Sequence, residues 1–251
     1  MAPDVDDWAP AVVPNDNQIA GGNRSGSAVE LDLEARLAGW RPDLDVDSAV
    51  TVQVFGEVGE TSRIPGPLLR AEQGMQMRVR ILNSIPDSTL VVYGFGADTL
   101  RIPSGETRET QYLAGAPGTY LYWGTTSAHE GTSTRMGREG QLTGAIIIDP
   151  PGVKPDARER IFVMTVIDIL PDTTKPEPRE DIWELAINGL SWPHSERLLY
   201  AVGDTVRWRW LNGSYLPHPM HLQRVSLPRA VEGRWADRHA IRAGPDSRCC
   251  H

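Results

Sequence analysis

Two histidines lie three residues apart in the segment PHPMHLQ, residues 217–223, directly after an extended aromatic stretch. Imidazole nitrogens are common ligands of copper and zinc, so the pair is a candidate metal site. In an extended chain, however, side chains three residues apart point to opposite faces. We therefore expect His218 and His221 to serve two different sites. The residue that would share a face with His221 is Gln223, a weak ligand compared with imidazole.

Few other groups in the sequence could do chemistry. Cys249 and Cys250 are adjacent and are the only cysteines, so the sequence predicts neither a disulfide framework nor a CxxC zinc site. His129, in SAHEGTST, and His194, in WPHSER, lie in polar turns, and we interpret both as exposed or hydrogen-bonded rather than as metal ligands. No GxSxG, HExxH or phosphate-binding glycine loop is present, so no catalytic residue is assigned.

Composition excludes several classes of partner. Hydrophobic residues make up 40% of the 251 positions and charged residues 23%, which is typical of a soluble globular protein. No apolar run approaches the roughly 20 residues that a membrane-spanning helix needs, so no membrane partner is expected. The formal charge of -8 argues against nucleic acid, because phosphate binding needs a basic face. The first residues lack the positive charge and apolar region of a secretory signal.

Short alternating segments separated by Gly and Pro predict an all-β fold. We find no long stretch in which apolar residues recur at helical spacing. Several short strands at this spacing favour a sandwich or a barrel. The predicted strands are residues 49–55, 77–82, 119–123, 142–148, 160–166 and 205–211.

An internal repeat indicates duplicated β domains. GMQMRVRILN, residues 74–83, aligns without gaps to GDTVRWRWLN, residues 203–212, with the same flanking Gly and Asn. Both copies alternate apolar and arginine side chains, so each is expected to bury its apolar face. We interpret the two tryptophans as core rather than as a substrate platform. The side chains predicted to face the core are Met77, Val79, Ile81, Val206, Trp208 and Trp210.

The repeat and the composition divide the chain into four parts. A linker rich in proline and charge, DPPGVKPDARE, is predicted between the two β domains. From Arg224 onward arginine recurs without strand alternation, and we hypothesise that a frameshift or a truncated gene replaced the rest of the second domain. The predicted parts are an N-terminal arm (1–28), a first domain (29–150), a partial second domain (159–223) and an atypical tail (224–251).

The sequence resembles the multicopper oxidases, the laccase-like cupredoxin proteins. NGLSWPHSERLLYAVGDTVRWRWLN followed by HPMHL is similar to their last strand block, whose pattern is H-P-x-H-L-H. GPLLRAEQGMQMRVRILN, GAPGTYLYWGTTS and GQLTGAIIIDPPG resemble their first-domain blocks. The resemblance covers most of residues 13–222 and implies tandem cupredoxin-like Greek-key β-sandwich or barrel domains, the second of them incomplete. It also implies copper as the cofactor.

The resemblance assigns roles to the two histidines. His218 matches a type 1 copper ligand, and His221 matches a ligand of the trinuclear cluster. Gln223 stands where the family has a type 3 ligand.

The other family ligands are missing from this sequence. Tyr93 and Gly96 lie near the places of the first His-x-His, and Tyr122-Trp123-Gly124 takes the place of the second. The closing His-Cys-His block has no counterpart, and we interpret the terminal CCH, residues 249–251, as an exposed chain end. The family pattern is thus degenerate or truncated here.

By resemblance, the chain is a copper-dependent oxidoreductase that couples one-electron oxidation of a small reducing substrate to reduction of dioxygen. With most ligands missing it is expected to be a weak oxidase or an inactive one. The alternatives are a non-catalytic cupredoxin-fold protein, which binds a partner or weakly binds copper through His218 and His221, and an inactive fragment. A homo-oligomer is left open, because two-domain relatives build their cluster between subunits. Relatives are periplasmic or secreted, which the missing signal contradicts, so the compartment is also left open.

Overall fold

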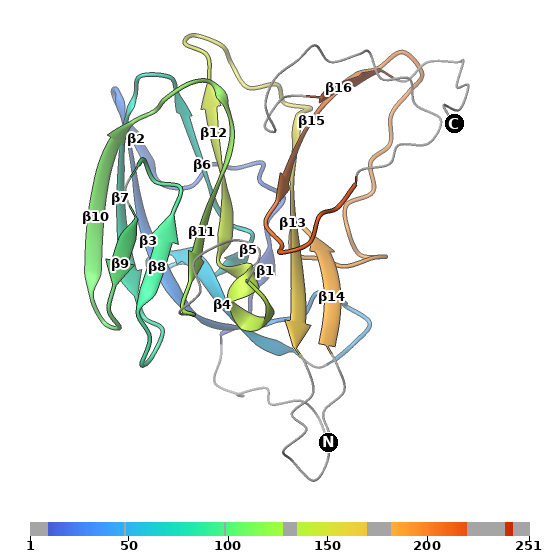
Figure 1. The fold of residues 1–251 in the computed structure, drawn as a ribbon. Helices are drawn as coiled ribbons and strands as arrows, with labels where there is room; N and C mark the ends of the chain where they lie inside the picture. The colour runs from blue at the N-terminus through green and yellow to red at the C-terminus, as the bar shows by residue number, and fades with distance from the viewer. Residues whose placement is uncertain are drawn as a thin grey trace.

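The computed structural model describes residues 10–47, 49–97, 99–127, 135–169 and 182–219, together with the backbone of 239–242. These residues form β-strands almost throughout, which confirms the predicted all-β fold (Figure 1). In the described ranges the helical structure is one short 3-10 turn, Gly137–Gln141. None of the described helical structure has the length and apolar character needed to cross a membrane.

Two five-stranded sheets make a sandwich. The first sheet has the order β10–β7–β3–β2, with β4 paired to β3. The second has the order β6–β12–β11–β8–β9. Side chains from both sheets form one buried core, which includes Leu33, Ile81, Leu90, Tyr122 and Ile146. The strands of the first sheet are β2 (Asn23–Ser25), β3 (Ala28–Trp40), β4 (Val50–Glu57), β7 (Gln76–Asn83) and β10 (Thr107–Leu113). Those of the second are β6 (Gly66–Glu72), β8 (Leu90–Tyr93), β9 (Leu100–Ile102), β11 (Gly118–Thr125) and β12 (Thr143–Asp149).

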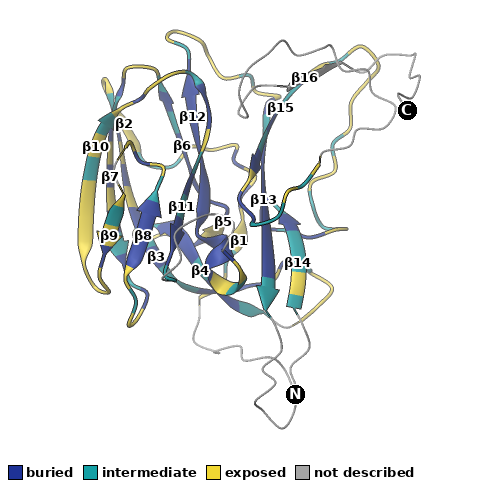
Figure 2. Cartoon of the chain, viewed as in Figure 1, coloured by how far each residue is buried: buried dark blue, intermediate teal, exposed yellow. Residues whose placement is uncertain are grey.

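A third sheet packs against this sandwich. Its order is β14 (Ile182–Ile187), β13 (Arg160–Ile169), β15 (Thr205–Asn212) and β16 (His239–Arg242). Ile161, Val163 and Leu211 of this sheet share a buried cluster with Ala145 and Ile147 of β12. Strands β12 and β13 are therefore buried along nearly their whole length, as Figure 2 shows. Burial on both faces explains their continuous apolar sequences.

All six predicted strands are present, but the alternation predicted for the repeat holds in one copy only. In β7 the apolar residues are buried and Arg78 and Arg80 are exposed, as expected. In β15 the predicted core face holds for Val206, which is 4% exposed, but not for Trp208 and Trp210, which are half-buried. Arg209, on the opposite face, is buried instead, because it pairs with the carboxylate of Glu159. The tryptophan rings pack on Phe162 in an edge-on contact and a tilted contact.

The described part of the predicted N-terminal arm lies against both the sandwich and the third sheet. Residues 13–25 contain β1 (Val13–Pro14), which pairs with β5 (Arg63–Ile64), and β2, which pairs with β3. Buried Asn17 donates through Nδ2 to Asn188 Oδ1 at 3.2 Å. Hydrogen bonds from polar side chains hold this segment against the two sheets. Its apolar residues do not alternate as they would in a half-buried strand.

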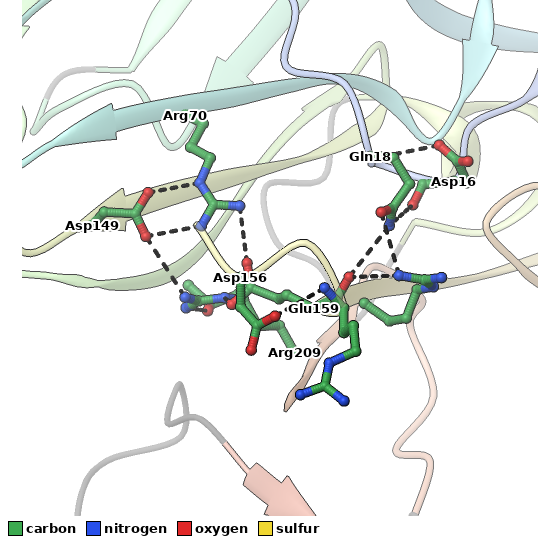
Figure 3. A network of polar contacts seen from close by, with 10 residues as sticks. Asp16, Gln18, Arg70, Asp149, Asp156, Glu159 and Arg209 are labelled. Atoms are coloured by element: carbon green, nitrogen blue, oxygen red, sulfur yellow. Dashed lines mark hydrogen bonds and ion pairs between the residues drawn. The ribbon is translucent and has the colours of Figure 1, made fainter. Parts of the chain in front are cut away.

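A buried ionic network fastens the third sheet to the sandwich (Figure 3). Arg70 of β6 donates to both carboxylate oxygens of Asp149, at 2.6 and 2.9 Å, and to Glu159 at 2.9 Å. Arg209 of β15 donates to Glu159 at 2.7 Å. The side chains of Glu159 and Arg209 are 3% and 2% exposed, so two cations and two anions neutralise each other inside the protein. Asp149 ends β12 and Glu159 precedes β13, so the network spans the predicted linker; the domain boundaries themselves stay predictions.

Candidate functional site

His218 lies in the turn that follows β15. Asn212 orders this turn, since its Nδ2 donates to the Leu216 carbonyl at 2.7 Å and its Oδ1 accepts from the Ser214 amide at 3.0 Å. The half-buried His218 ring contacts the Ser214 hydroxyl through Nε2 at 2.9 Å. His221 and Gln223 lie outside the described residues, so the expectation that the two histidines serve different sites stays a prediction.

A buried arginine is anchored directly beneath this turn. Arg135 is fully buried, and its Nη1 donates to the Gly213 carbonyl at 3.1 Å. Burial lowers the pKa of Arg135 to about 10, so the guanidinium is still charged at neutral pH. Four further oxygens surround Nη2 at 2.7 to 3.1 Å: the carbonyls of Glu139, Gly140 and Leu142 and the hydroxyl of Thr143.

Two aromatic rings lie beside this guanidinium. Tyr93 of β8 is directly opposite Trp123 of β11, and the rings stack at a centroid distance of 4.1 Å with an interplanar angle of 18°. The Arg135 Cζ atom lies 5.2 Å from the centroid of the Trp123 ring, within cation–π range. The fold thus brings together the two segments that the resemblance gives to the His-x-His pairs. The two facing residues are aromatic, and the Arg135 cation packs on Trp123.

Tyr122 and Gly96, the other residues near the expected ligand positions, are closely packed as well. Tyr122 is buried between Phe55 and Phe95, and its hydroxyl donates to the Pro67 carbonyl at 2.7 Å. Burial raises the pKa of Tyr122 well above its ordinary value, so it stays protonated. Gly96 has a φ of +80°, and a side chain there would meet the Tyr112 ring. A ligand side chain at Gly96 would therefore be strained.

Glu139 orders the loop after β11. Its Oε2 accepts from the Thr125 hydroxyl at 2.7 Å and from the Thr126 and Ser127 amides at 2.8 and 3.0 Å. Sequence reasoning missed both Arg135 and Glu139, which lie in the polar segment RMGRE. No periodicity marks that segment as buried, and an arginine is usually exposed.

The described residues around His218 do not fit a multicopper centre. They offer one imidazole, one hydroxyl and a guanidinium, whereas copper centres use several imidazoles and a thiolate. A buried cation beside the turn also opposes the entry of metal cations. Cys249, Cys250 and His251, interpreted above as a chain end, lie outside the described residues.

Comparison with known proteins identifies the fold. No protein-family model matches the chain, and no curated protein matches it. Among solved structures, the multicopper oxidase mgLAC superposes with a TM-score of 0.59 at 17% identity, over 86% of this chain and 76% of that one. The blue copper oxidase from Nitrosomonas europaea gives 0.56 at 17% identity, over 74% and 61%.

A copper nitrite reductase from the same organism gives a TM-score of 0.55 at 19% identity, over 74% of this chain and 67% of that one. The chain spans about three fifths of the length of the blue copper oxidase. At these identities the likeness concerns the fold, which is that of the cupredoxin-type copper proteins.

Proposed function

We propose that this chain is a non-catalytic cupredoxin-fold protein related to the multicopper oxidases, which binds at most one copper ion through His218 and His221. The observation that carries this proposal is the Tyr93–Trp123 stack beneath Arg135. These rings belong to the two segments, around Tyr93 and Tyr122-Trp123-Gly124, where the resemblance expects the His-x-His pairs of the copper cluster.

The chemistry of dioxygen explains why this replacement is decisive. Reduction of dioxygen to water takes four electrons, so an oxidase that uses one-electron donors needs several linked metals to store them. A type 1 centre and a trinuclear cluster would together hold about four copper ions, with imidazole and thiolate as the donors. Aromatic rings and a guanidinium supply no such donor, so oxidase turnover is not expected.

The third sheet supports the proposed division into a first domain (29–150) and an incomplete second domain (159–223). Within the described residues it is a single sheet, and Trp208 and Trp210 on its outer face are half-buried. A complete cupredoxin domain would stack a second sheet on that face. The frameshift hypothesis concerns residues 224–251, of which the structure describes only the backbone of 239–242.

The competing proposal is an active copper oxidoreductase, with a small reducing substrate and dioxygen as its partners. The likeness of the fold to copper oxidases favours it. It requires that residues outside the described ranges, or a second subunit in a homo-oligomer, supply every missing ligand. The third alternative, an inactive fragment, differs from the non-catalytic protein in having no stable fold of its own.

Copper titration of the full chain separates these proposals. The relevant copper ion is the one that is lost in the His218→Ala variant and retained in the matched control, His129→Ala. We expect this difference to be at most one ion per chain, and no oxygen uptake with a one-electron donor. A total of about four copper ions in the unaltered chain, or oxygen uptake that depends on His218, would establish the oxidase instead. A non-cooperative unfolding curve for the unaltered chain would establish the fragment.

A further inference from the structure

A second cluster of metal-ligating side chains lies where the loop between β3 and β4 meets the turn after β14. His194 Nε2 is 3.1 Å from Asp43 Oδ1 and 3.4 Å from Asp45 Oδ2. One ligand atom from each of the three residues lies within 4.8 Å of the other two. The interpretation of His194 as hydrogen-bonded is confirmed, and the structure adds a second carboxylate to its surroundings.

Backbone hydrogen bonds hold the loop and the turn together. The Ser191 amide donates to the Pro42 carbonyl at 2.8 Å, and the His194 amide donates to the Ser191 carbonyl at 2.8 Å. Trp40, at the end of β3, donates through its indole nitrogen to the Gly189 carbonyl at 2.8 Å. These bonds bring the loop of Asp43 to the turn of His194, while the Asp45 side chain is 79% exposed.

Negative charge exceeds positive charge at this cluster. In the described part of the chain, His194 is the ion-pair partner of both carboxylates. Glu184 of β14 adds a third carboxylate, and burial together with the charge of Asp43 raises its pKa. Arg41, the nearest basic residue in sequence, donates instead to the Val46 carbonyl at 3.0 Å and contacts Asp47. A divalent cation would neutralise this excess.

One further polar group in the same turn has no partner. The Ser191 hydroxyl is buried, with the residue 4% exposed, and it forms no hydrogen bond with any described residue. Ser191 is the residue whose backbone bridges Pro42 and His194. A buried hydroxyl without a partner is uncommon, and water bound to a nearby ion supplies such partners.

We propose that Asp43, Asp45 and His194 bind a divalent transition-metal ion of the zinc type, with water completing the coordination. Zinc binds imidazole nitrogen and carboxylate oxygen at about 2.0–2.2 Å, which places ligand atoms of a tetrahedral site roughly 3.3–3.5 Å apart. The observed separation of 3.4 Å lies within this range, and the separation of 3.1 Å is slightly below it. Calcium is a poorer fit because it takes 6–8 oxygen ligands. The ion links the sandwich to the third sheet.

Zinc titration of the full chain tests this site. Because thiolates also bind zinc tightly, every variant carries Cys249→Ser and Cys250→Ser, and each protein is first stripped with chelator. We expect one zinc ion per chain and an unfolding midpoint about 5 °C higher at saturating zinc. His194→Ala should abolish this midpoint shift, and Asp43→Asn should weaken binding at least about tenfold, since a charged ligand is lost. His129→Ala, the matched control, should keep both the ion and the shift.

The same experiment distinguishes a metal site from a plain ion pair. If the cluster is only an ion pair, zinc leaves the unfolding midpoint of the unaltered protein unchanged, and the proposal fails. A zinc-induced shift that survives in His194→Ala also overturns it, because the ion then binds elsewhere. Neither result bears on copper at His218, so this proposal and the proposed function fail independently.

Discussion

At the scale of single residues, Glu159 is the acid shared by two arginines, the half-buried Arg70 and the buried Arg209. Its carboxylate accepts from Arg70 at 2.9 Å and from Arg209 at 2.7 Å. Glu159→Gln keeps the shape of the side chain but leaves excess positive charge in the interior, so we expect a loss of about 3 kcal/mol of unfolding free energy. Urea denaturation followed by tryptophan fluorescence measures it.

The matched control for this prediction is Glu196→Gln. Glu196 also pairs with an arginine, Arg160, at 3.0 Å, but its side chain is 37% exposed. Solvent screens such a pair, so the expected change is under about 1 kcal/mol. Equal losses in the two variants would mean that the buried network does not hold the third sheet in place.

Glu184 gives the structure a testable pH dependence. Burial and the charge of Asp43 raise its pKa, so ionised Glu184 destabilises the metal-free fold. Stability should therefore rise as the pH falls from neutral through the folded-state pKa of this carboxyl, because protonation removes the penalty. Glu184→Gln should be more stable than the unaltered chain at neutral pH, and this advantage should disappear near about pH 4. The urea midpoints of the two proteins, measured across this pH range with zinc removed, test this prediction. A difference between the two midpoints that does not change with pH would contradict it.

At the scale of elements, the pairing of β11 with β12 depends on a glycine. Tyr122 is paired with Gly144, and a Cβ there would lie 2.2 Å from the tyrosine ring. Gly144→Ala should cost about 3 kcal/mol, because the buried ring cannot move without disturbing the core. Gly115→Ala is the control, since nothing lies within 4 Å of its Cβ position, and it should be neutral. Chemical denaturation compares the stabilities of the two variants. Equal stabilities would contradict the close packing of the Tyr122 ring on Gly144.

Arg135 links three elements: the 3-10 turn, β11 and the turn that holds His218. Arg135→Lys removes the planar fork that reaches several acceptors and the packing on Trp123, so we expect a loss of about 2–4 kcal/mol. Arg138→Lys, an exposed substitution in the same turn, should change stability by less than about 0.5 kcal/mol. Thermal unfolding measures the stability of both variants. If Arg135→Lys is as stable as the unaltered chain, Arg135 is not the anchor of this junction.

The strands that could be predicted from the sequence are those marked by alternating apolar residues or by a continuous apolar run. The predicted strands around Met77, Ile146 and Val163 are of this kind. Strand β3, thirteen residues long, was missed although Val29, Leu31 and Leu33 alternate with polar residues in the pattern of a half-buried strand. Burial of Arg209 in place of the tryptophans could not be predicted, since its carboxylate partners are 50 or more residues away in sequence.

At the scale of the whole molecule, the candidate site was only partly predictable. The resemblance correctly indicated the fold, and it placed Tyr93 and the triplet Tyr122-Trp123-Gly124 where the family has its His-x-His pairs. That these two residues stack on each other, with Arg135 packed on Trp123, follows from strand pairing and burial, which no local pattern reports. The assignment of copper to His218 and His221 stays a prediction.

The most direct test is an anomalous diffraction map at the copper absorption edge, from crystals of the copper-loaded full chain. We expect stacked Tyr93 and Trp123 rings beside Arg135, with no copper peak between β8 and β11. A single peak at His218 would agree with the proposed function. A group of copper peaks among β8, β11 and the turn that holds His218 would contradict it, because metal would then occupy the junction that these side chains fill.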